Sequence, residues 1–273
     1  MHKKYLWNKY GLRLQYIKSR EGNPWNWLFL PGGPGLGSES LYQLTACLNL
    51  PGTIWHIDLP GDGSNTFANN VEAFKRWPLA LEEVADAFDH VILAAHSSGG
   101  MYALSLPSFE EKLLGLILMN SAPDSSWQRA LQKMMQSSPI PELEKLDKMY
   151  KENPSNEALK RLTLAAAPYF FTEKGLEKGK ALLQELPFNY EVCNWSEENF
   201  DSTYKAQWIP QNLLTLIISG TEDHLTPLSL FKTSEAFNRK NILLKEINHA
   251  GHFPWIENPN EVIKAFDEFL FQL

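Results

Sequence analysis

Short apolar runs closed by glycine, proline, aspartate or serine recur along this chain of 273 residues. Nearly unbroken runs of this length are typical of strands buried on both faces of a sheet. The first 20 residues predict one or two further strands, at an edge of the sheet. The six runs are WNWLFLPGG (25–33), TIWHIDLPG (53–61), VILAAHSSGG (91–100), LLGLILMNSAP (113–123), LLTLIISGTED (213–223) and NILLKEINHAGH (241–252).

Stretches with helical periodicity lie between some of these runs. Residues 77–88, WPLALEEVADAF, have Pro78 near the start and an apolar stripe along one face. Residues 260–273, NEVIKAFDEFLFQL, open with Asn260, a residue type that caps helices. Strands that alternate with helices predict an α/β fold, with a mostly parallel central sheet flanked by helices.

Residues 124–206 interrupt the alternation, because they contain no convincing buried strand. They read as short helices, such as WQRALQKMMQ, PELEKLDKMY and NEALKRLTLAAA. The sheet pattern resumes near residue 213 and needs its earlier half to close a core. We therefore interpret 124–206 as a helical insertion into one domain, which is made of residues 1–123 and 207–273.

The composition excludes several classes of partner. The net charge is −7 and no run of lysine and arginine stands out, so we expect neither nucleic acid nor an anionic membrane as partner. The first residues lack the apolar core of a signal peptide, and no stretch is long enough to span a bilayer. Cys47 and Cys193 lie far apart without metal-ligand spacing, so we expect two reduced thiols in a cytoplasmic protein.

The run 91–100 ends in a pattern that favours a reactive serine. A serine on a sharp turn from strand to helix needs small residues two positions before and after it. Ala95 and Gly99 meet this need for Ser97, whereas the neighbours of Ser98 would include the bulky imidazole of His96. Ser97 is therefore the candidate nucleophile, and Ser98 supplies a backbone N–H for a developing oxyanion.

A serine nucleophile also needs a base and an acid that orients the base. The chain offers both at the ends of predicted strands, with Asp223 in TEDHLTP and His252 in NHAGHFPW. Glu222 and His249 are their nearby rivals. We favour Asp223 and His252, because each follows a predicted strand in the order Ser, Asp, His.

The glycine-rich loop FLPGGPGLGSES can turn a backbone N–H toward the oxyanion site, and Gly33 is our candidate for it. A dinucleotide-binding G-x-G-x-x-G pattern would start at Gly33, but Ser38 stands where its last glycine is required. Pro34 would also remove a phosphate-facing amide. We expect no cofactor and no metal.

With these motifs in place, the sequence resembles the α/β-hydrolase superfamily over nearly its whole length. The resemblance implies Ser97 as nucleophile in AHSSGG, Asp223 as acid in the G-x-x-D-x-x-x-P turn, and His252 as base in AGHFPWIENP. DLPGDGSN (58–65) is similar to the superfamily's D-x-x-G-x-G-x-S segment, which is usually structural. The insertion at 124–206 corresponds to the cap, which covers the active site and sets substrate choice.

Within the superfamily, PGGPG is similar to the oxyanion loop of prolyl aminopeptidases, although those enzymes carry histidine where this chain has Pro31. Selection of a free α-amino group needs carboxylates in the cap. The segment NWSEENFD offers Glu197, Glu198 and Asp201, unless it is a solvated acidic turn. The segment APYFF, which includes Tyr169, lines an apolar substrate pocket or packs on the core.

These observations predict a serine hydrolase that acts on an ester or amide of a small molecule or short peptide. Three alternatives stay open: a prolyl aminopeptidase-like peptidase, a carbon–carbon bond hydrolase or acyltransferase using the same site, and a ligand-binding protein with little turnover. Ser97 argues against the aspartate nucleophile of dehalogenases and epoxide hydrolases. The sequence does not specify the oligomeric state.

Overall fold

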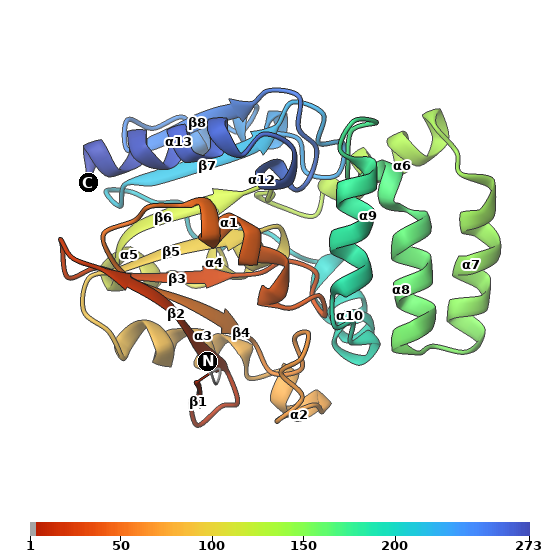
Figure 1. Cartoon of the computed structure of the whole chain (residues 1–273), viewed down its shortest axis with the longest axis horizontal. Coiled ribbons are helices and arrows are strands. Elements are labelled where there is room, and N and C mark those ends of the chain that lie inside the picture. The colour runs from red at the N-terminus through yellow and green to blue at the C-terminus, as the bar shows by residue number, and fades with distance from the viewer. Residues whose placement is uncertain (1–3) are drawn as a thin grey trace.

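The computed structural model describes residues 4–273 and has an eight-stranded sheet at its centre (Figure 1). The strand order is β1-β2-β4-β3-β5-β6-β7-β8. β2 pairs antiparallel with β1 and β4, and the remaining pairs are parallel. The strands are β1 Tyr5–Trp7, β2 Arg13–Arg20, β3 Asn26–Leu30, β4 Gly52–Asp58, β5 Val91–His96, β6 Leu113–Met119, β7 Thr215–Gly220 and β8 Ile242–Ile247.

The predicted fold class is confirmed. All six apolar runs form strands β3 to β8, and the N-terminal segment supplies β1 and β2, with residues 1–3 outside the described part. The side chains of β5 explain why its run is unbroken. Ile92 and Ala94 join the core on one face of the sheet, while Leu93 and Ala95 join the core on the other. A strand covered on both faces has no solvent-facing positions left for polar residues.

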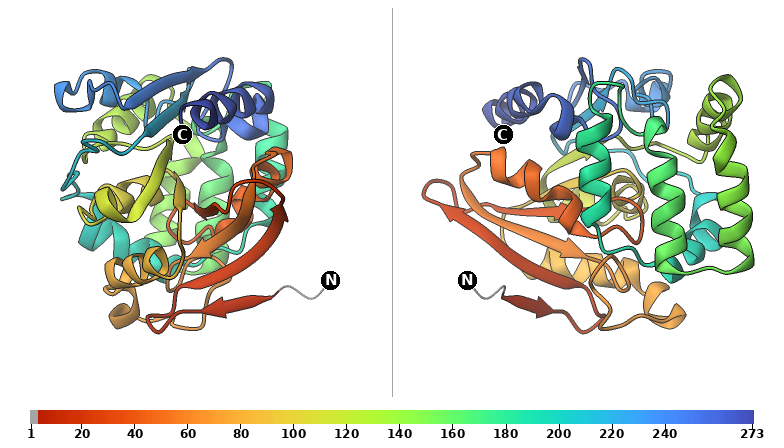
Figure 2. Two further views of the ribbon diagram at one scale, coloured as in Figure 1. Left: turned by 90° about the vertical axis from the view of Figure 1, so that its left-hand side faces the viewer. Right: turned by 45° about the vertical axis from the view of Figure 1, so that its right-hand side comes forward.

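Two layers of helices cover the sheet, as the views in Figure 2 show. α1, α12 and α13 contribute to one core, and α3, α4, α5 and α11 contribute to the other. Among residues 4–273, no helix combines the length and apolar content needed to cross a membrane. The helices of the two layers are α1 Tyr42–Cys47, α3 Trp77–Asp86, α4 Ser98–Ala103, α5 Phe109–Lys112, α11 Ser229–Lys232, α12 Pro254–Glu257 and α13 Pro259–Gln272. A short helix, α2 Val71–Phe74, follows β4.

The capping residue of α13 differs from the prediction. The side chain of Asn258, not that of Asn260, accepts a hydrogen bond from the backbone N–H of Glu261. Pro259 then occupies the first turn of the helix. Proline suits this place because its fixed φ is helical and its missing N–H would have had no partner. The cap therefore lies two residues earlier than we predicted.

The segment between β6 and β7 is helical and lies beyond the end at which the parallel strands terminate (Figure 1). We call residues 124–206 the insertion. A short 3₁₀ turn, η2, follows α8, and one turn of π-helix, η3, follows α10. The elements are α6 Trp127–Ser137, α7 Pro141–Glu152, α8 Asn156–Ala165, η2 Ala167–Tyr169, α9 Leu176–Glu185, α10 Tyr190–Ser196 and η3 Glu197–Asp201.

The C-terminal helix offers a test of the core. Phe266 is fully buried and stacks on Phe29, with ring centroids 6.4 Å apart, whereas Phe271 on the same helix is 93% exposed. We expect Phe266→Ala to lower the free energy of unfolding by about 3–5 kcal/mol through lost burial and a cavity. Phe271→Ala should change it by less than about 0.5 kcal/mol. Urea denaturation measures both, and equal effects would contradict this packing.

Candidate active site

Ser97 lies on a strained turn between β5 and α4. Its φ is +50° and its ψ −122°, a conformation that residues with a side chain rarely adopt. Hydrogen bonds hold the turn on both sides. The N–H of Ser97 donates to the carbonyl of Met119 (2.9 Å), and the Ser121 hydroxyl donates to the carbonyl of Ser97 (2.8 Å). The turn thereby presents the Ser97 hydroxyl beyond the end of the sheet.

Three glycines make room for this turn. A Cβ on Gly99 would lie 2.4 Å from the carbonyl oxygen of Pro31, and one on Gly100 would lie 2.5 Å from Oγ of Ser121. A Cβ on Gly32 would lie 2.5 Å from the Cβ of Ser97. The loop after β3 and the turn after β5 are therefore in backbone contact, which no larger residue permits.

His252 connects Ser97 to Asp223 by hydrogen bonds. Nε2 of His252 is 3.0 Å from Oγ of Ser97, and Nδ1 is 3.1 Å from Oδ2 of Asp223. A carboxylate accepts only, so Nδ1 carries the proton and Nε2 is left to accept from the serine. The arrangement can therefore draw the proton from Ser97 toward Nε2.

Asp223 is fully enclosed but well supplied with donors. Its Oδ2 accepts from Nδ2 of Asn120 (2.8 Å) and from the hydroxyl of Thr226 (2.9 Å), and its Oδ1 accepts from the N–H groups of Leu225 and Thr226. Burial alone would raise the pKa of Asp223. The His252 ring and these hydrogen bonds outweigh it and hold the pKa well below its usual range.

Asn120 is a member of this site that the sequence analysis missed. It follows β6, is fully buried and has a φ of +48°. Besides Asp223, its Nδ2 also donates to the carbonyl of Gly251 (3.1 Å). It thus holds the acid and the residue before His252 together. The signal was present, since Asn120 ends an apolar run, as the other site residues do.

The rivals of the acid and the base face solvent. Nδ1 of His249 lies 3.9 Å from Glu222, and the two side chains are 89% and 48% exposed. The structure therefore brings Asp223 and His252 to Ser97, and not their neighbours in the sequence.

The buried His96 contacts both the backbone and the ring of the base, His252. Its Nε2 donates to the carbonyl of His252 (2.9 Å), and the two rings lie 4.9 Å apart. Burial, assisted by repulsion from His252, lowers the pKa of His96 to about 3. A neutral ring beside His252 adds no repulsion when His252 becomes protonated.

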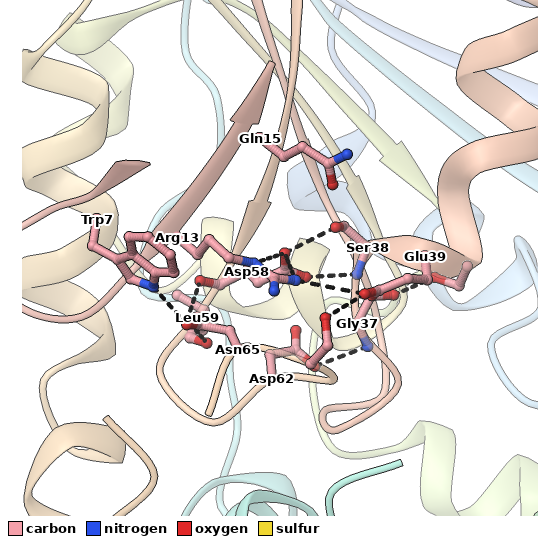
Figure 3. Close-up of polar contacts among 12 residues, drawn as sticks. Trp7, Arg13, Gln15, Gly37, Ser38, Glu39, Asp58, Leu59, Asp62 and Asn65 are labelled. Atoms are coloured by element: carbon pink, nitrogen blue, oxygen red, sulfur yellow. Dashed lines mark hydrogen bonds and ion pairs between the residues drawn. The ribbon is translucent and has the colours of Figure 1, made fainter. Parts of the chain in front are cut away.

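The loop that carries Gly33 is held by two buried acidic side chains, Asp58 and Asp62 (Figure 3). Asp58 accepts from the N–H and the hydroxyl of Ser38, at 2.6 and 2.9 Å. Asp62 accepts from the N–H groups of Gly35 (2.8 Å) and Gly37 (3.1 Å). Burial, with repulsion from Asp58, raises the pKa of Asp62 to about 8. The segment 58–65 therefore fixes the loop next to Ser97.

Arg13 neutralises this cluster from β2. Its guanidinium donates to Oδ2 of Asp58 from both Nε (3.1 Å) and NH2 (2.8 Å), and both side chains are almost completely buried. Asn65 closes the segment where the superfamily pattern has serine. Its amide donates to the carbonyls of Gly11, Asp58 and Leu59 and accepts from the indole of Trp7.

Hydrogen bonds join the insertion to the loop that carries His252 and to the helix that follows it. The N–H of His252 donates to the carbonyl of Phe170 (2.7 Å). Glu257 on α12 accepts from the N–H and hydroxyl of Thr172, at 2.8 and 2.7 Å, and from the N–H of Gly251 (2.7 Å). The position of the base therefore depends on residues of the insertion.

An apolar cavity of about 160 Å³ opens at Ser97. Gly33 lies in its wall, and Ser98, the first residue of α4, has an N–H without a partner inside the helix. Leucine and phenylalanine side chains from the insertion close the far side. The cavity is lined by Gly33, Pro34, Leu36, His96, Ser97, Leu159, Thr163, Phe170, Leu183, Cys193, Leu225, His252 and Phe253.

Four candidate substrate residues do not line this cavity. Glu197 and Glu198 lie on η3 and are exposed, while Asp201, on the same turn, is half-buried and accepts from the hydroxyl of Ser196 (3.0 Å). Tyr169 is buried and donates its hydroxyl to the carbonyl of Ser138 (2.9 Å), beside a different cavity. Their positions follow from helix packing within the insertion. In the described part of the chain, no three His, Cys, Asp or Glu side chains are grouped to hold a metal ion.

The profile of the Alpha/beta hydrolase family matches residues 27–265. The chain belongs to this family. No curated protein matches this α/β hydrolase over its sequence.

Solved structures share the fold of this α/β hydrolase at low sequence identity. An alpha/beta fold family hydrolase from Bacillus anthracis str. Sterne has a TM-score of 0.74 and 16% identity, over 98% of both chains. A proline iminopeptidase-related protein from Thermus thermophilus has 0.74 and 18%, over 99% of this chain and 98% of the other. An esterase from Exiguobacterium antarcticum has 0.71 and 16%, over 98% and 99%.

His96 makes the stability of this α/β hydrolase depend on pH. Below about pH 6.5 an unfolded histidine takes up a proton, whereas folded His96 resists protonation down to a pKa of about 3. The stability that this difference contributes is fully present above pH 6.5 and is lost as the pH falls. Relative to His96→Gln, the wild type should lose about 2 kcal/mol more between pH 7.5 and 5. Urea titrations test this, and parallel curves would contradict it.

The buried Arg13–Asp58 pair gives a second prediction. Arg13→Met leaves the Asp58 carboxylate buried without its cation, so we expect the free energy of unfolding at pH 7 to fall by about 3–5 kcal/mol. Lys75→Met is the control, because Lys75 pairs with Glu72 at the surface. It should change stability by less than about 1 kcal/mol. Similar losses in the two variants would show that burial of the pair is irrelevant.

Proposed function

We propose that this α/β hydrolase is a serine hydrolase that cleaves a small carboxylic ester through an acyl-enzyme. The hydrogen-bonded chain from Ser97 through His252 to Asp223 supports this proposal most directly, at 3.0 and 3.1 Å. Family membership supports a hydrolase. The insertion would act as the cap over the site, because its side chains close the cavity at Ser97.

In the first half of the reaction, Oγ of Ser97 attacks the carbonyl carbon of the ester while its proton moves to Nε2 of His252. Asp223 holds the imidazole and stabilises the imidazolium that forms. The carbonyl oxygen takes the negative charge, facing the N–H groups of Gly33 and Ser98. Loss of one such donor would cost roughly 3–4 kcal/mol of transition-state stabilisation.

Collapse of the tetrahedral intermediate breaks the bond to the alcohol oxygen, which takes the proton from His252. The acyl group is then bonded to Ser97. Water repeats the sequence: it gives a proton to Nε2, attacks the acyl carbon and releases the acid while the proton returns to Ser97.

The cavity favours an ester over an aminopeptidase substrate. A free α-ammonium group requires a carboxylate partner when it is buried. Among the described residues that line the cavity at Ser97, none is aspartate or glutamate, and the candidates Glu197 and Glu198 are exposed. An uncharged group in an apolar pocket has no such requirement.

We expect Ser97→Ala and His252→Ala each to lower kcat for p-nitrophenyl acetate by about 10⁴–10⁶-fold. Asp223→Asn should cost about 10⁴-fold, because it removes the acceptor that fixes the histidine tautomer. Glu222→Gln is the matched control and should leave kcat within a few-fold of wild type. A larger loss in Glu222→Gln than in Asp223→Asn would reassign the acid.

Labelling with a fluorophosphonate, followed by mass spectrometry of the modified peptide, tests the nucleophile before any substrate is known. Stoichiometric adduct on Ser97 is the expected result. Folded protein without adduct would overturn the proposal and favour a ligand-binding role. Release of proline from prolyl p-nitroanilide faster than acetate from its ester would favour the aminopeptidase alternative.

A further inference from the structure

The cavity at Ser97 holds only a small group, so a larger substrate would extend beyond it. Its volume is about 160 Å³. A cavity of about 150 Å³ is filled by a molecule the size of benzene. Sites that enclose whole small ligands measure about 300–1,000 Å³. The remainder of a larger substrate therefore needs space elsewhere.

A second apolar cavity of about 520 Å³ lies inside the insertion. It is formed where α7 and α8 lie side by side and α6 lies near one end of the pair (Figure 1). Leu131 and Met135 of α6, Leu143 of α7 and Leu162 of α8 supply apolar walls. We call this space the insertion cavity. Its volume falls in the range of sites that enclose whole small ligands.

Phe170 borders both cavities. Its ring centroid is 6.4 Å from that of His252, so it stands directly beside the base. The helix α8 continues the same partition: Leu159 and Thr163 face the cavity at Ser97, while Leu162 faces the insertion cavity. Phe170 and the helix α8 therefore lie between the two spaces.

The insertion cavity is loosely covered on its outer side. No residue of α6 is buried, although the helix carries Leu131 and Met135 toward the cavity. Met135 is 43% exposed. Apolar side chains that remain exposed at the mouth of an apolar cavity favour an apolar ligand there. Glu144 and Asp147 also border the cavity, so a negatively charged ligand end would be repelled.

We propose that Phe170 limits the chain length of the ester, and that the insertion cavity is a latent substrate subsite, which takes the uncharged linear apolar chain when the ring of Phe170 is removed. This proposal rests on the proposed function of the Ser97 site. With the ring in place, only a short chain fits beside Ser97. Without the ring, the chain continues into the insertion cavity. Phe170 is thus a specificity-determining residue.

The test compares long and short chains on each side of the ester bond. The first ratio is kcat/KM for p-nitrophenyl decanoate over p-nitrophenyl acetate, and the second is that for decyl acetate over ethyl acetate. Phe170→Ala should raise one of these ratios by at least about tenfold, since each buried methylene strengthens binding several-fold. The ratio that rises shows whether the chain belongs to the acid or to the alcohol. No rise in either overturns the proposal.

Two tryptophan variants locate the chain. Met135 and Met149 are both 43% exposed, but only Met135 borders the insertion cavity. In the Phe170→Ala background, Met135→Trp should fill the cavity and return the raised ratio toward the wild-type value. Met149→Trp, the matched control on α7, should leave that ratio raised. Equal effects of the two substitutions would place the chain elsewhere and overturn the proposal.

A binding measurement separates this inference from the proposed function. Calorimetric titration of Ser97→Ala/Phe170→Ala protein with decanoate and with 1-decanol, the products that carry the chain on the acid and on the alcohol side, needs no catalysis. Adding Met135→Trp should weaken binding at least tenfold relative to adding Met149→Trp. If no ester is hydrolysed but this difference appears, the proposed function fails and the subsite stands. If esters are hydrolysed but neither decanoate nor 1-decanol binding shows such a difference, only the subsite fails.

Discussion

The backbone contact between the loop after β3 and the turn at Ser97 is the constraint on which the rest of the site depends. The turn holds a serine at a positive φ, which is strained, and only dense packing around it can keep that conformation. Gly32, Gly99 and Gly100 allow this density because a side chain at any of them would meet a neighbouring atom. The unbroken apolar strand β5 anchors the turn in two cores. The position and rigidity of Ser97 thus come from glycines and apolar residues that take no part in the reaction.

Buried charge fixes the same loop from its other side. Apolar contacts could hold the loop near Ser97, but they would not orient its N–H groups. Asp58 and Asp62 do so by accepting hydrogen bonds directly from the backbone. Burying carboxylates is unfavourable unless they are paired. Arg13 offsets part of that cost at Asp58, and the raised pKa of Asp62 offsets it by retaining a proton. Precise placement of one loop therefore accounts for much of the polar interior on this side of the sheet.

The sequence was most informative where one physical rule governs a position. Unbroken apolar runs must be strands covered on both faces, and their ends in a parallel sheet meet at one edge, so Ser97 and His252 could be placed together. Asn120 obeys the same rule but was missed, because an amide suggests no reaction by itself. The sequence predicted that the insertion is helical, but it did not predict how the helices of the insertion pack. Whether Tyr169 or Glu197 faces Ser97 depends on how several short amphipathic helices lie on one another, and periodicity does not contain that information.

The hydrogen bonds between the insertion and the segment around His252 also determine which part of the insertion can move without disturbing the base. The carbonyl of Phe170 and the N–H and hydroxyl of Thr172 are bonded to the loop and helix that position His252. A hinge that lifted the whole insertion would break these bonds and misalign the base each time. Helix α6 makes no hydrogen bond to this segment, and none of its side chains is buried. Local opening at α6 would therefore leave the hydrogen bonds that position His252 intact.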